Sequence, residues 1–178
     1  MIVLVTGGAR SGKSRIAEAR ALELGALELG PLALGAAHSP RATYIATAEP
    51  FDDEMRARIA LHRARRGAEW ADHPAPLELC DALAATDSGP ARLVDCLTLW
   101  LNNIMYHGRD LADARAQLCA ALRAARAPVV LVSNEIGMGI VPENALARAF
   151  RDAQGLLNQE IAAVADEVIL AVSGLPLR

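Results

Sequence analysis

Short apolar runs alternate with longer amphipathic stretches along the whole chain. The short runs are typical of strands that are buried on both faces, and they lie at residues 2–5, 42–46, 93–95, 128–132 and 167–172. The longer stretches are rich in helix-forming residues, and we expect helices at residues 14–24, 52–66, 76–85, 97–103, 111–126 and 144–165. This alternation predicts an α/β fold, a mostly parallel sheet with helices on both faces.

The segments between these elements hold the turn-forming residues. Gly25 stands where a C-cap would end the first helix, so residues 26–40 are expected to form a loop or a short extra helical turn. Two prolines make residues 70–76 a predicted loop as well. No interdomain linker is evident, and one domain is expected over residues 1–178. The buried positions expected in the short helix at 76–85 are Leu77, Cys80 and Leu83.

Residues 7–14 read GGARSGKS and match the phosphate-binding P-loop, G-x-x-x-x-G-K-[ST]. An apolar strand precedes the motif and a helix follows it, which is the context that this chemistry requires. The glycines let backbone N–H groups turn around a phosphate, and the helix N-terminus adds partial positive charge. Lys13 is expected to reach the β- and γ-phosphates, and Ser14 to hold Mg²⁺. The alternative is a glycine turn that binds nothing, which the context disfavours.

Asp95 ends the apolar strand at 93–95, which is the Walker-B arrangement. A carboxylate there shares Mg²⁺ with Ser14 and with nucleotide oxygens. An aspartate after a short strand can also be a simple helix cap. The P-loop in the same chain favours the metal role, so Ser14 and Asp95 are the predicted metal ligands.

His62 has two possible roles in the helix expected at 52–66. It continues an inward stripe at helical spacing, and such a histidine is more often a core residue than a catalyst. Three arginines follow it closely and can gather phosphate oxygens, beside which a neutral imidazole can attack phosphorus. Alternatively, these arginines are a solvated helix end that complements the macrodipole. The stripe consists of Asp52, Met55, Ile59 and His62, and the arginines are Arg63, Arg65 and Arg66.

The segment SNEIGMG at 133–139 follows a buried strand, at the edge where open α/β sheets bind ligands. We expect it to face the nucleotide or its acceptor, with Glu135 as a candidate for acceptor or metal contact. The alternative is an ordinary connection, although residues 133–144 exceed the usual length of about two to six. The N-K-x-D string of regulatory GTPases does not occur in the chain, which disfavours a switch-type GTPase.

Composition narrows the possible partners. A net charge of −3 and 3% aromatic residues argue against a nucleic-acid surface. No apolar run approaches the ~20 residues that span a bilayer, so membrane insertion is not expected. The three cysteines form no C-x-x-C pair and are expected to be core thiols in a reducing, cytoplasmic setting.

Four stretches together resemble a known family, the bifunctional adenosylcobinamide kinase/adenosylcobinamide-phosphate guanylyltransferase of cobalamin biosynthesis. They are GGARSGKS at Gly7, YIATAEPFDDEMRARIALHRARR at Tyr44, LVDCLTLWLNN at Leu93, and VLVSNEIGMGIVPENALARAFRDAQGLLNQEIAAVADEV at Val130. The resemblance implies a P-loop NTPase-type domain that assembles as a homotrimer and acts on a small-molecule corrinoid.

The resemblance also implies two reactions that use GTP, ATP and Mg²⁺. In the first, a nucleoside triphosphate phosphorylates the aminopropanol hydroxyl of adenosylcobinamide. In the second, GTP gives GMP to a histidine, and the GMP then passes to the new phosphate to form adenosylcobinamide-GDP. By position, the nucleophile falls on His62. The nucleotide-binding residues fall on Gly7, Gly8, Ala9, Arg10, Ser11, Gly12, Lys13, Ser14, Ala46, Thr47, Ala48, Arg63, Ala64, Arg65, Arg66 and Asp95.

The chain departs from the family pattern in two places. The family often carries Trp-Arg-Thr-x-Glu after the arginines, where this chain has Ala71 and Pro74 at the Arg and Glu positions. Whether Asp72 replaces the missing Glu is open. The segment at 26–38 is longer than we expect between the first helix and the second strand. It either shapes a subunit contact or has no function. Two other functions stay open from residues alone: a P-loop small-molecule kinase without guanylyl transfer, and a nucleotide-binding regulatory module.

Overall fold

Seven strands form one sheet in the computed structural model, in the order β3-β2-β4-β5-β1-β6-β7. The structure describes residues 1–33, 40–50, 52–64 and 66–178, with no side chains described at 29–33, 54, 55, 58 and 62. The strands are β1 (Ile2–Gly7), β2 (Ala42–Ala46), β3 (Trp70–Pro74), β4 (Ala91–Asp95), β5 (Val129–Asn134), β6 (Glu167–Val172) and β7 (Leu175–Leu177). The helices are α1 (Lys13–Ala33), α2 (Asp53–Ala64), α3 (Leu79–Ala85), α4 (Leu97–Tyr106), α5 (Leu111–Ala124) and α6 (Ala145–Ala162).

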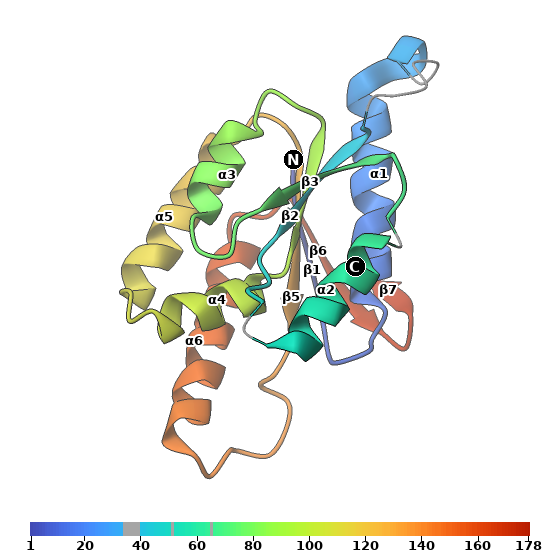
Figure 1. The fold of residues 1–178 in the computed structure, drawn as a ribbon. Coiled ribbons are helices and arrows are strands. Elements are labelled where there is room, and N and C mark those ends of the chain that lie inside the picture. Colours follow the sequence, from blue (N-terminus) through green and yellow to red (C-terminus); the bar gives the residue numbers. More distant parts are fainter. Residues whose placement is uncertain (34–39, 51, 65) are drawn as a thin grey trace.

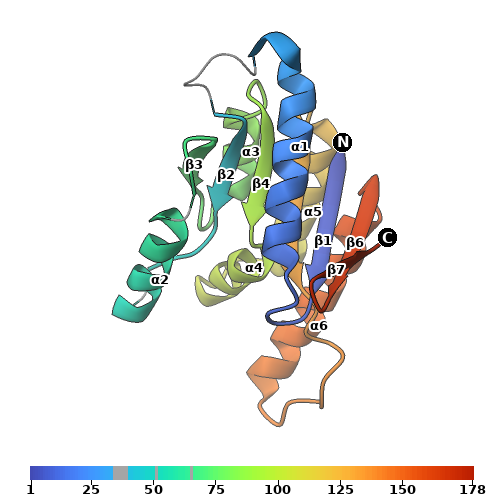
Figure 2. The ribbon, with the colours of Figure 1, turned by 90° about the vertical axis from the view of Figure 1, so that its right-hand side faces the viewer.

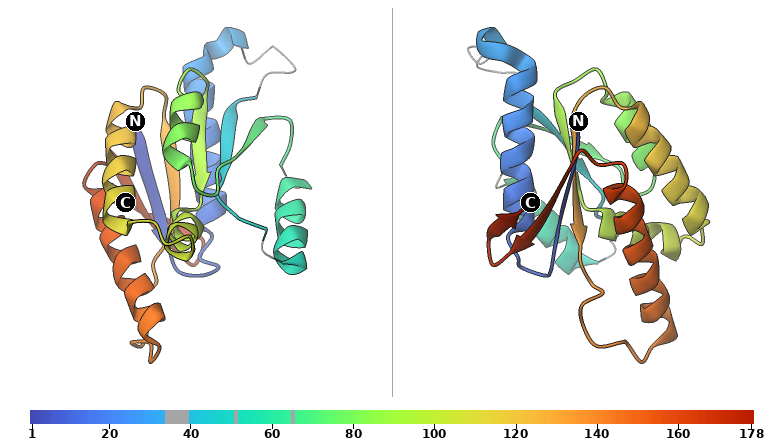
Figure 3. Two further views of the ribbon diagram at one scale, coloured as in Figure 1. Left: turned by 60° about the vertical axis from the view of Figure 1, so that its left-hand side comes forward. Right: turned by 180° about the vertical axis from the view of Figure 1, so that it is seen from behind.

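Helices cover both faces of the sheet, as predicted. Helix α1 lies on one face, and α3, α4, α5 and α6 lie on the other (Figures 1 and 3). Alternate residues of β1 serve the two cores, because Val3 and Val5 pack on the α1 side while Leu4 packs on the other side. All strand pairs are parallel except β6–β7, so the mostly parallel α/β fold is confirmed. None of the helices within the described ranges combines the length and apolar character needed to cross a membrane.

The strand register brings several predicted site residues to one edge. Gly7, the first P-loop residue, lies opposite Asn134 at the end of β5. Asp95 lies opposite Val132 of β5 and opposite Ala46 of β2. These strands therefore end together at the carboxyl edge of the sheet, which is the ligand-binding edge of open α/β folds.

Gly25 does not end the first helix, and the prediction that it is a C-cap was wrong. Helix α1 continues to Ala33, so the predicted loop at 26–40 begins as helix, and its residues 34–39 lie outside the described residues. A Cβ atom on Gly25 would lie 1.9 Å from the carbonyl oxygen of Arg41. The glycine is therefore explained by close approach of α1 to the chain entering β2, not by a helix stop.

The segment 70–76 is not a loop, because its first part forms strand β3. It pairs with β2 alone, at the edge of the sheet, and its proline is the last residue of the strand. Strand β7 was also missed; it is three residues long and antiparallel to β6. The helix predicted at 76–85 begins only at Leu79, so Leu77 precedes α3. The expected burial is partly wrong, since Leu83 is buried but Leu77 and Cys80 are only half-buried, and the other buried positions of α3 are Leu79 and Ala82.

Helix α2 forms where a helix was predicted, and it stands apart from both helix layers (Figures 2 and 3). Ile59, on the expected inward stripe, is half-buried, and Leu61, two residues further along and so on the opposite side of the helix, is 63% exposed. The side chains of Met55 and His62 are not among those that the structure describes, so the inward stripe stays a prediction.

A buried ion pair closes the end of the sheet opposite the site. The guanidinium of Arg92 has no exposed surface, donates to the carbonyl oxygens of Leu83 and Ala127, and lies 3.0 Å from a carboxylate oxygen of Asp87. Burial alone would raise the pKa of Asp87. Hydrogen bonds from Arg126 and Ala127 and the charge of Arg92 outweigh it and lower that pKa to about 2.

We expect Asp87→Asn to lower the free energy of unfolding at neutral pH by about 3 kcal/mol, because it leaves a buried cation without its carboxylate. The folded pKa of Asp87 lies below its ordinary value of 3.8, so the unfolded chain takes up the proton first. This contribution to stability is therefore present above about pH 4 and is lost as the pH falls towards about 2. Urea unfolding of both proteins across this range measures the difference. Equal midpoints at pH 7 would contradict the prediction.

Candidate functional site

The P-loop backbone is packed so tightly that two of its glycines cannot be replaced without displacing neighbours. A Cβ on Gly7 would lie 2.6 Å from the carbonyl oxygen of Ala171 and 2.7 Å from the Ser11 hydroxyl. Gly12 has φ +91°, and its Cβ would lie 3.0 Å from the Cα of Gly174. These glycines therefore satisfy both a backbone conformation and a close approach.

The turn between β6 and β7 supports the P-loop from outside. The backbone N–H of Gly174 donates to the carbonyl oxygen of Ser11 at 2.8 Å, and both turn residues, Ser173 and Gly174, have positive φ. The sequence reading missed this support. The Ser-Gly pair after the last predicted strand was the available turn signal.

Two P-loop side chains suit a bound phosphate. The hydroxyl of Ser11 is buried and has no hydrogen-bond partner within the part of the chain that the structure describes. The ammonium of Lys13 is half-buried and donates to the carbonyl oxygen of Gly8 at 3.0 Å. Burial lowers the pKa of Lys13, although the nearby negative charge of Asp95 acts to raise it. A bound anion would accept a hydrogen bond from the buried hydroxyl and would pair with the desolvated ammonium, so both groups suit a phosphate.

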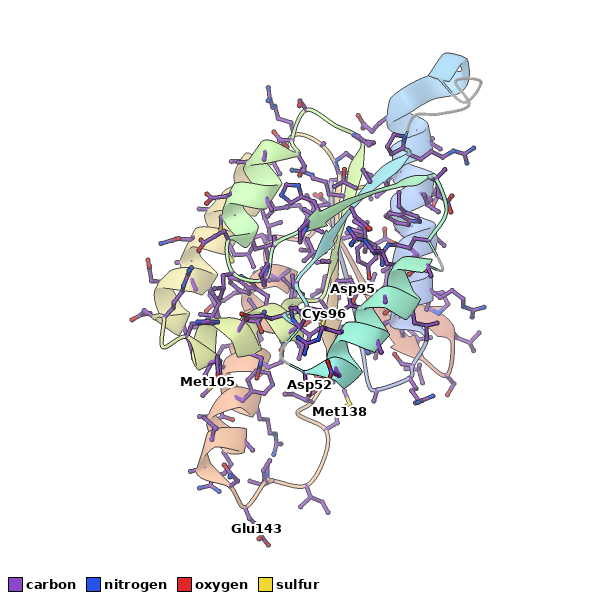
Figure 4. The ribbon with its side chains drawn as sticks, viewed as in Figure 1. Asp52, Asp95, Cys96, Met105, Met138 and Glu143 are labelled. Atoms are coloured by element: carbon purple, nitrogen blue, oxygen red, sulfur yellow. The ribbon has the colours of Figure 1, made fainter. Side chains whose placement is uncertain are left out.

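Asp95 lies at the carboxyl end of β4, next to Cys96 (Figure 4). The hydroxyl of Tyr44 donates to its Oδ2 at 2.6 Å. Burial raises the pKa of Tyr44 far above its usual range, so this hydroxyl remains a donor. Tyr44 was not predicted as a site residue, because its contact depends on how β2 pairs with β4.

The donor set suits magnesium. Ser14 is half-buried in the first turn of α1, and Asp95 is half-buried at the end of β4. A hydroxyl and a single carboxylate are hard oxygen ligands, and Mg²⁺ typically adds substrate phosphates and water to so few protein ligands. No cluster of three or more His, Cys, Asp or Glu side chains that could hold a metal occurs among the described residues. This donor set favours a metal that arrives with a nucleotide.

Thr47 has a structural position that the sequence did not indicate. Its hydroxyl accepts from the backbone N–H of Cys96 and donates to the carbonyl oxygen of Cys96, both at 2.7 Å. Its own N–H donates to the carbonyl oxygen of Asp95. Thr47 has no exposed surface, so a nucleotide contact at this strand end suits its half-buried neighbours Ala46 and Ala48 better.

The arginine segment meets the sheet through Asp72. Arg63 and Arg66 each donate to a different carboxylate oxygen of Asp72, at 2.6 and 2.7 Å. Their position as nucleotide contacts stays a prediction, as does that of the exposed Ala64. Arg65 lies outside the described residues. His62 is in the last turn of α2.

The loop after β5 starts at the P-loop and then leaves the protein body. The backbone N–H of Glu135 donates to the carbonyl oxygen of Gly7 at 3.0 Å, which ties the first loop residue to the candidate phosphate site. Met138 is 82% exposed and Ile140 is 97% exposed. Glu143 lies far from the sheet, at the tip of this segment (Figure 4). The Glu135 carboxylate accepts a hydrogen bond from the backbone N–H of Gly137. A contact between Glu135 and the acceptor substrate stays a prediction.

A polar network behind the loop was not predicted. Gln154 and Asn158 of α6 hydrogen-bond the buried hydroxyl of Ser133, and the amide of Asn158 also donates to the carbonyl oxygen of Asn134. Polar residues on the inward face of a predicted helix were the only available signal. These contacts fix the end of β5 beside the P-loop.

Comparison with known proteins decides the family. The chain matches the family described as cobinamide kinase/cobinamide phosphate guanyltransferase over residues 3–178. The chain belongs to the cobinamide kinase/cobinamide phosphate guanyltransferase family. It is 43% identical to the bifunctional adenosylcobalamin biosynthesis protein CobU of Salmonella typhimurium over 195 aligned residues, covering 100% of this chain and 99% of that protein. It is also 43% identical to the bifunctional adenosylcobalamin biosynthesis protein CobP of Pseudomonas aeruginosa, and the alignment covers 98% of this chain and 94% of that protein.

Membership of the cobinamide kinase/guanyltransferase family confirms the resemblance drawn from the sequence motifs. The chain is a bifunctional, nucleotide-using enzyme of cobalamin biosynthesis, not a kinase alone or a regulatory module. Among solved structures, the flagellar accessory protein FlaH of Methanocaldococcus jannaschii has 13% identity and a TM-score of 0.49, covering 95% of this chain and 70% of that chain. A structural similarity at this level carries no information about the function of this chain.

We expect Lys13→Ala to abolish both activities while the protein stays folded. Loss of a preorganised charge on the β- and γ-phosphates typically costs ~2.7–4 kcal/mol, or about 10²–10³ in rate. Steady-state assays of phosphorylation and of guanylyl transfer measure the loss, and circular dichroism checks the fold. Near-normal turnover by a folded variant would contradict the role of Lys13.

Proposed function

We propose that one domain, residues 1–178, carries both reactions at the carboxyl edge of the sheet. The packed P-loop beside Lys13 and Asp95 is the observation that carries this proposal, because it suits a triphosphate with its metal. In the first reaction ATP or GTP gives its γ-phosphoryl group to the aminopropanol hydroxyl of adenosylcobinamide. That transfer needs positioning and charge but no protein nucleophile.

In the second reaction the nucleotide is GTP and His62 is the nucleophile. A neutral imidazole nitrogen forms a bond to the α-phosphorus, and the bond from that phosphorus to the bridging oxygen of pyrophosphate breaks. The phosphate of adenosylcobinamide phosphate then attacks the same phosphorus and releases the histidine, giving adenosylcobinamide-GDP. Arg63 and Arg66, with Arg65 between them in the sequence, supply positive charge near the transferred group.

Mg²⁺ is the proposed metal, held by the Ser14 hydroxyl and the Asp95 carboxylate. When bound, it neutralises charge on the phosphate oxygens. The chain's own contribution is to orient these oxygens: Lys13 and the P-loop N–H groups hold the phosphates, and Tyr44 holds one carboxylate oxygen of Asp95. The nucleotide contacts proposed in addition are Gly8, Ala9, Arg10 and Gly12 of the P-loop, with Ala46, Ala48 and Ala64.

The proposed partners are a corrinoid and two further copies of the chain, in the cytoplasm. Neither a nucleic acid nor a membrane is among them. The number of copies follows from the family resemblance. An interface is supported by an exposed apolar surface on the β5–α6 loop and the start of α6, since apolar patches of this kind commonly mark interfaces. This exposed apolar surface consists of Met138, Ile140, Val141 and Leu146.

Replacing His62 separates the two reactions. We expect His62→Ala to form no covalent GMP adduct and to lose guanylyl transfer, while phosphorylation of adenosylcobinamide stays within about threefold of the native rate, because only the second reaction uses a protein nucleophile. Incubation with α-labelled GTP and a corrinoid phosphorylation assay measure the two outcomes.

His107→Ala is the matched control, because His107 pairs with Glu49 outside the P-loop and should leave adduct formation intact. Label uptake by a folded His62→Ala protein would remove His62 as the nucleophile. His73→Ala would then test the next histidine along the chain.

A further inference from the structure

Helix α2 carries His62 and stands apart from both helix layers (Figure 2). Among its side chains that the structure describes, only that of Ile59 is half-buried and the others are exposed. A nucleophile must nevertheless lie within a fraction of an ångström of its productive position, since a misplacement of about 1 Å can cost about 10² in rate. Polar contacts at the end of this helix are therefore candidates for fixing its position.

The contacts of Asp72 meet this need. Arg63, in the last turn of α2, donates from Nε to Oδ2 of Asp72 at 2.6 Å. Arg66, two residues after the helix, donates from Nη2 and Nε to Oδ1 at 2.7 and 3.1 Å. The Arg66 side chain is only 10% exposed and that of Asp72 is 25% exposed, whereas that of Arg63 is 63% exposed. A partly desolvated carboxylate that receives two guanidinium groups is a stronger tether than a solvated surface pair.

The tether continues into the candidate active site across the sheet. Asp72 of β3 lies opposite Tyr44 of β2, so their side chains share one face of the sheet. The guanidinium of Arg66 lies over the Tyr44 ring, 3.7 Å from its centroid, and the Tyr44 hydroxyl donates to Asp95. The end of α2 is thus joined by direct contacts to the carboxylate beside the P-loop.

We propose that Asp72 is a positioning residue for guanylyl transfer, which fixes the C-terminal end of α2 on the sheet through Arg63 and Arg66. This inference rests on the proposed role of His62 in the same helix. Partial burial tends to raise the pKa of Asp72, but the two arginines outweigh it and hold that pKa below its usual range. The Asp72 carboxyl is therefore ionised at neutral pH. Asp72 stands in a segment where the family pattern has no acidic residue at that position, and its carboxylate receives both arginines.

Hydrogen exchange of the free protein tests the tether without any activity. We expect amides of residues 53–66 to exchange about tenfold faster in Asp72→Asn than in the native protein, because the local opening of α2 becomes easier. Asp72→Glu should restore part of the protection. Glu78→Gln is the matched control: it removes a carboxylate from an exposed arginine pair elsewhere, with Arg109, and should leave α2 unchanged.

Kinetics test the positioning role. In Asp72→Asn the rate of GMP-adduct formation at saturating GTP should fall about 10²-fold, with less than a threefold change in the GTP concentration that gives half the maximal rate. Phosphorylation of adenosylcobinamide should stay within about threefold of native, and Asp72→Glu should recover most of the adduct rate. A merely structural role would lower both reactions together.

The outcomes are separable. Native protection of α2 and a native adduct rate in Asp72→Asn would overturn the proposal. If the native protein forms no adduct, the proposed function fails, and the exchange data still decide whether Asp72 holds α2. If Asp72→Asn does not fold, Arg63→Gln removes one of the two tethers without changing the sheet, and unchanged exchange at 53–66 in that variant would overturn the proposal.

Discussion

The close packing of the P-loop backbone against the β6–β7 turn is the constraint on which the site depends. Gly7 and Gly12 approach Ala171 and Gly174 so closely that a side chain at either position would displace backbone. This packing exists because β6 pairs directly with β1, which brings the last strands of the chain beside its first loop. The conformation of the P-loop is therefore a product of the whole sheet, although its motif is only eight residues long.

A second level of organisation lies on the α1 face of the sheet. Tyr44, Asp72 and Asp95 come from three adjacent strands, and direct contacts join them to Arg66. Lys13 begins α1 on this same face. In the proposed function, phosphoryl transfer at a γ-phosphate and guanylyl transfer at an α-phosphate need a triphosphate held in different ways. A fixed P-loop and a separately tethered helix suit this proposal, because the P-loop serves both reactions while the helix serves one.

Sequence predicted the parts of this arrangement that are local. The P-loop, Asp95 and most elements were predictable, because each depends on neighbouring residues or on the apolar pattern. Strand β3 was not, because Ala71, Asp72 and Pro74 are poor strand formers, and the strand forms by pairing with β2. Gly25 was misread because a close approach to Arg41 leaves no local signal. Tyr44 and Asp72 were missed as partners of Asp95 and the arginines for the same reason: their contacts depend on strand register.

Helix α2 shows what a periodic pattern leaves open. Of the apolar members of its predicted stripe the structure describes only the side chain of Ile59, which is half-buried. Among the described contacts, ion pairs of Arg63 and Arg66 with Asp72 join the end of this segment to the sheet. Periodicity indicates a preferred face of a helix but not the element that this face contacts.

The central claim is that a histidine of α2 carries GMP between the two substrates. The most direct measurement is to incubate the native protein with GTP and Mg²⁺, digest it under conditions that preserve a phosphoramidate, and map the modified residue by mass spectrometry. The account predicts one GMP group, on His62. A GMP group on another residue, or complete guanylyl transfer without any protein-bound GMP, would contradict it.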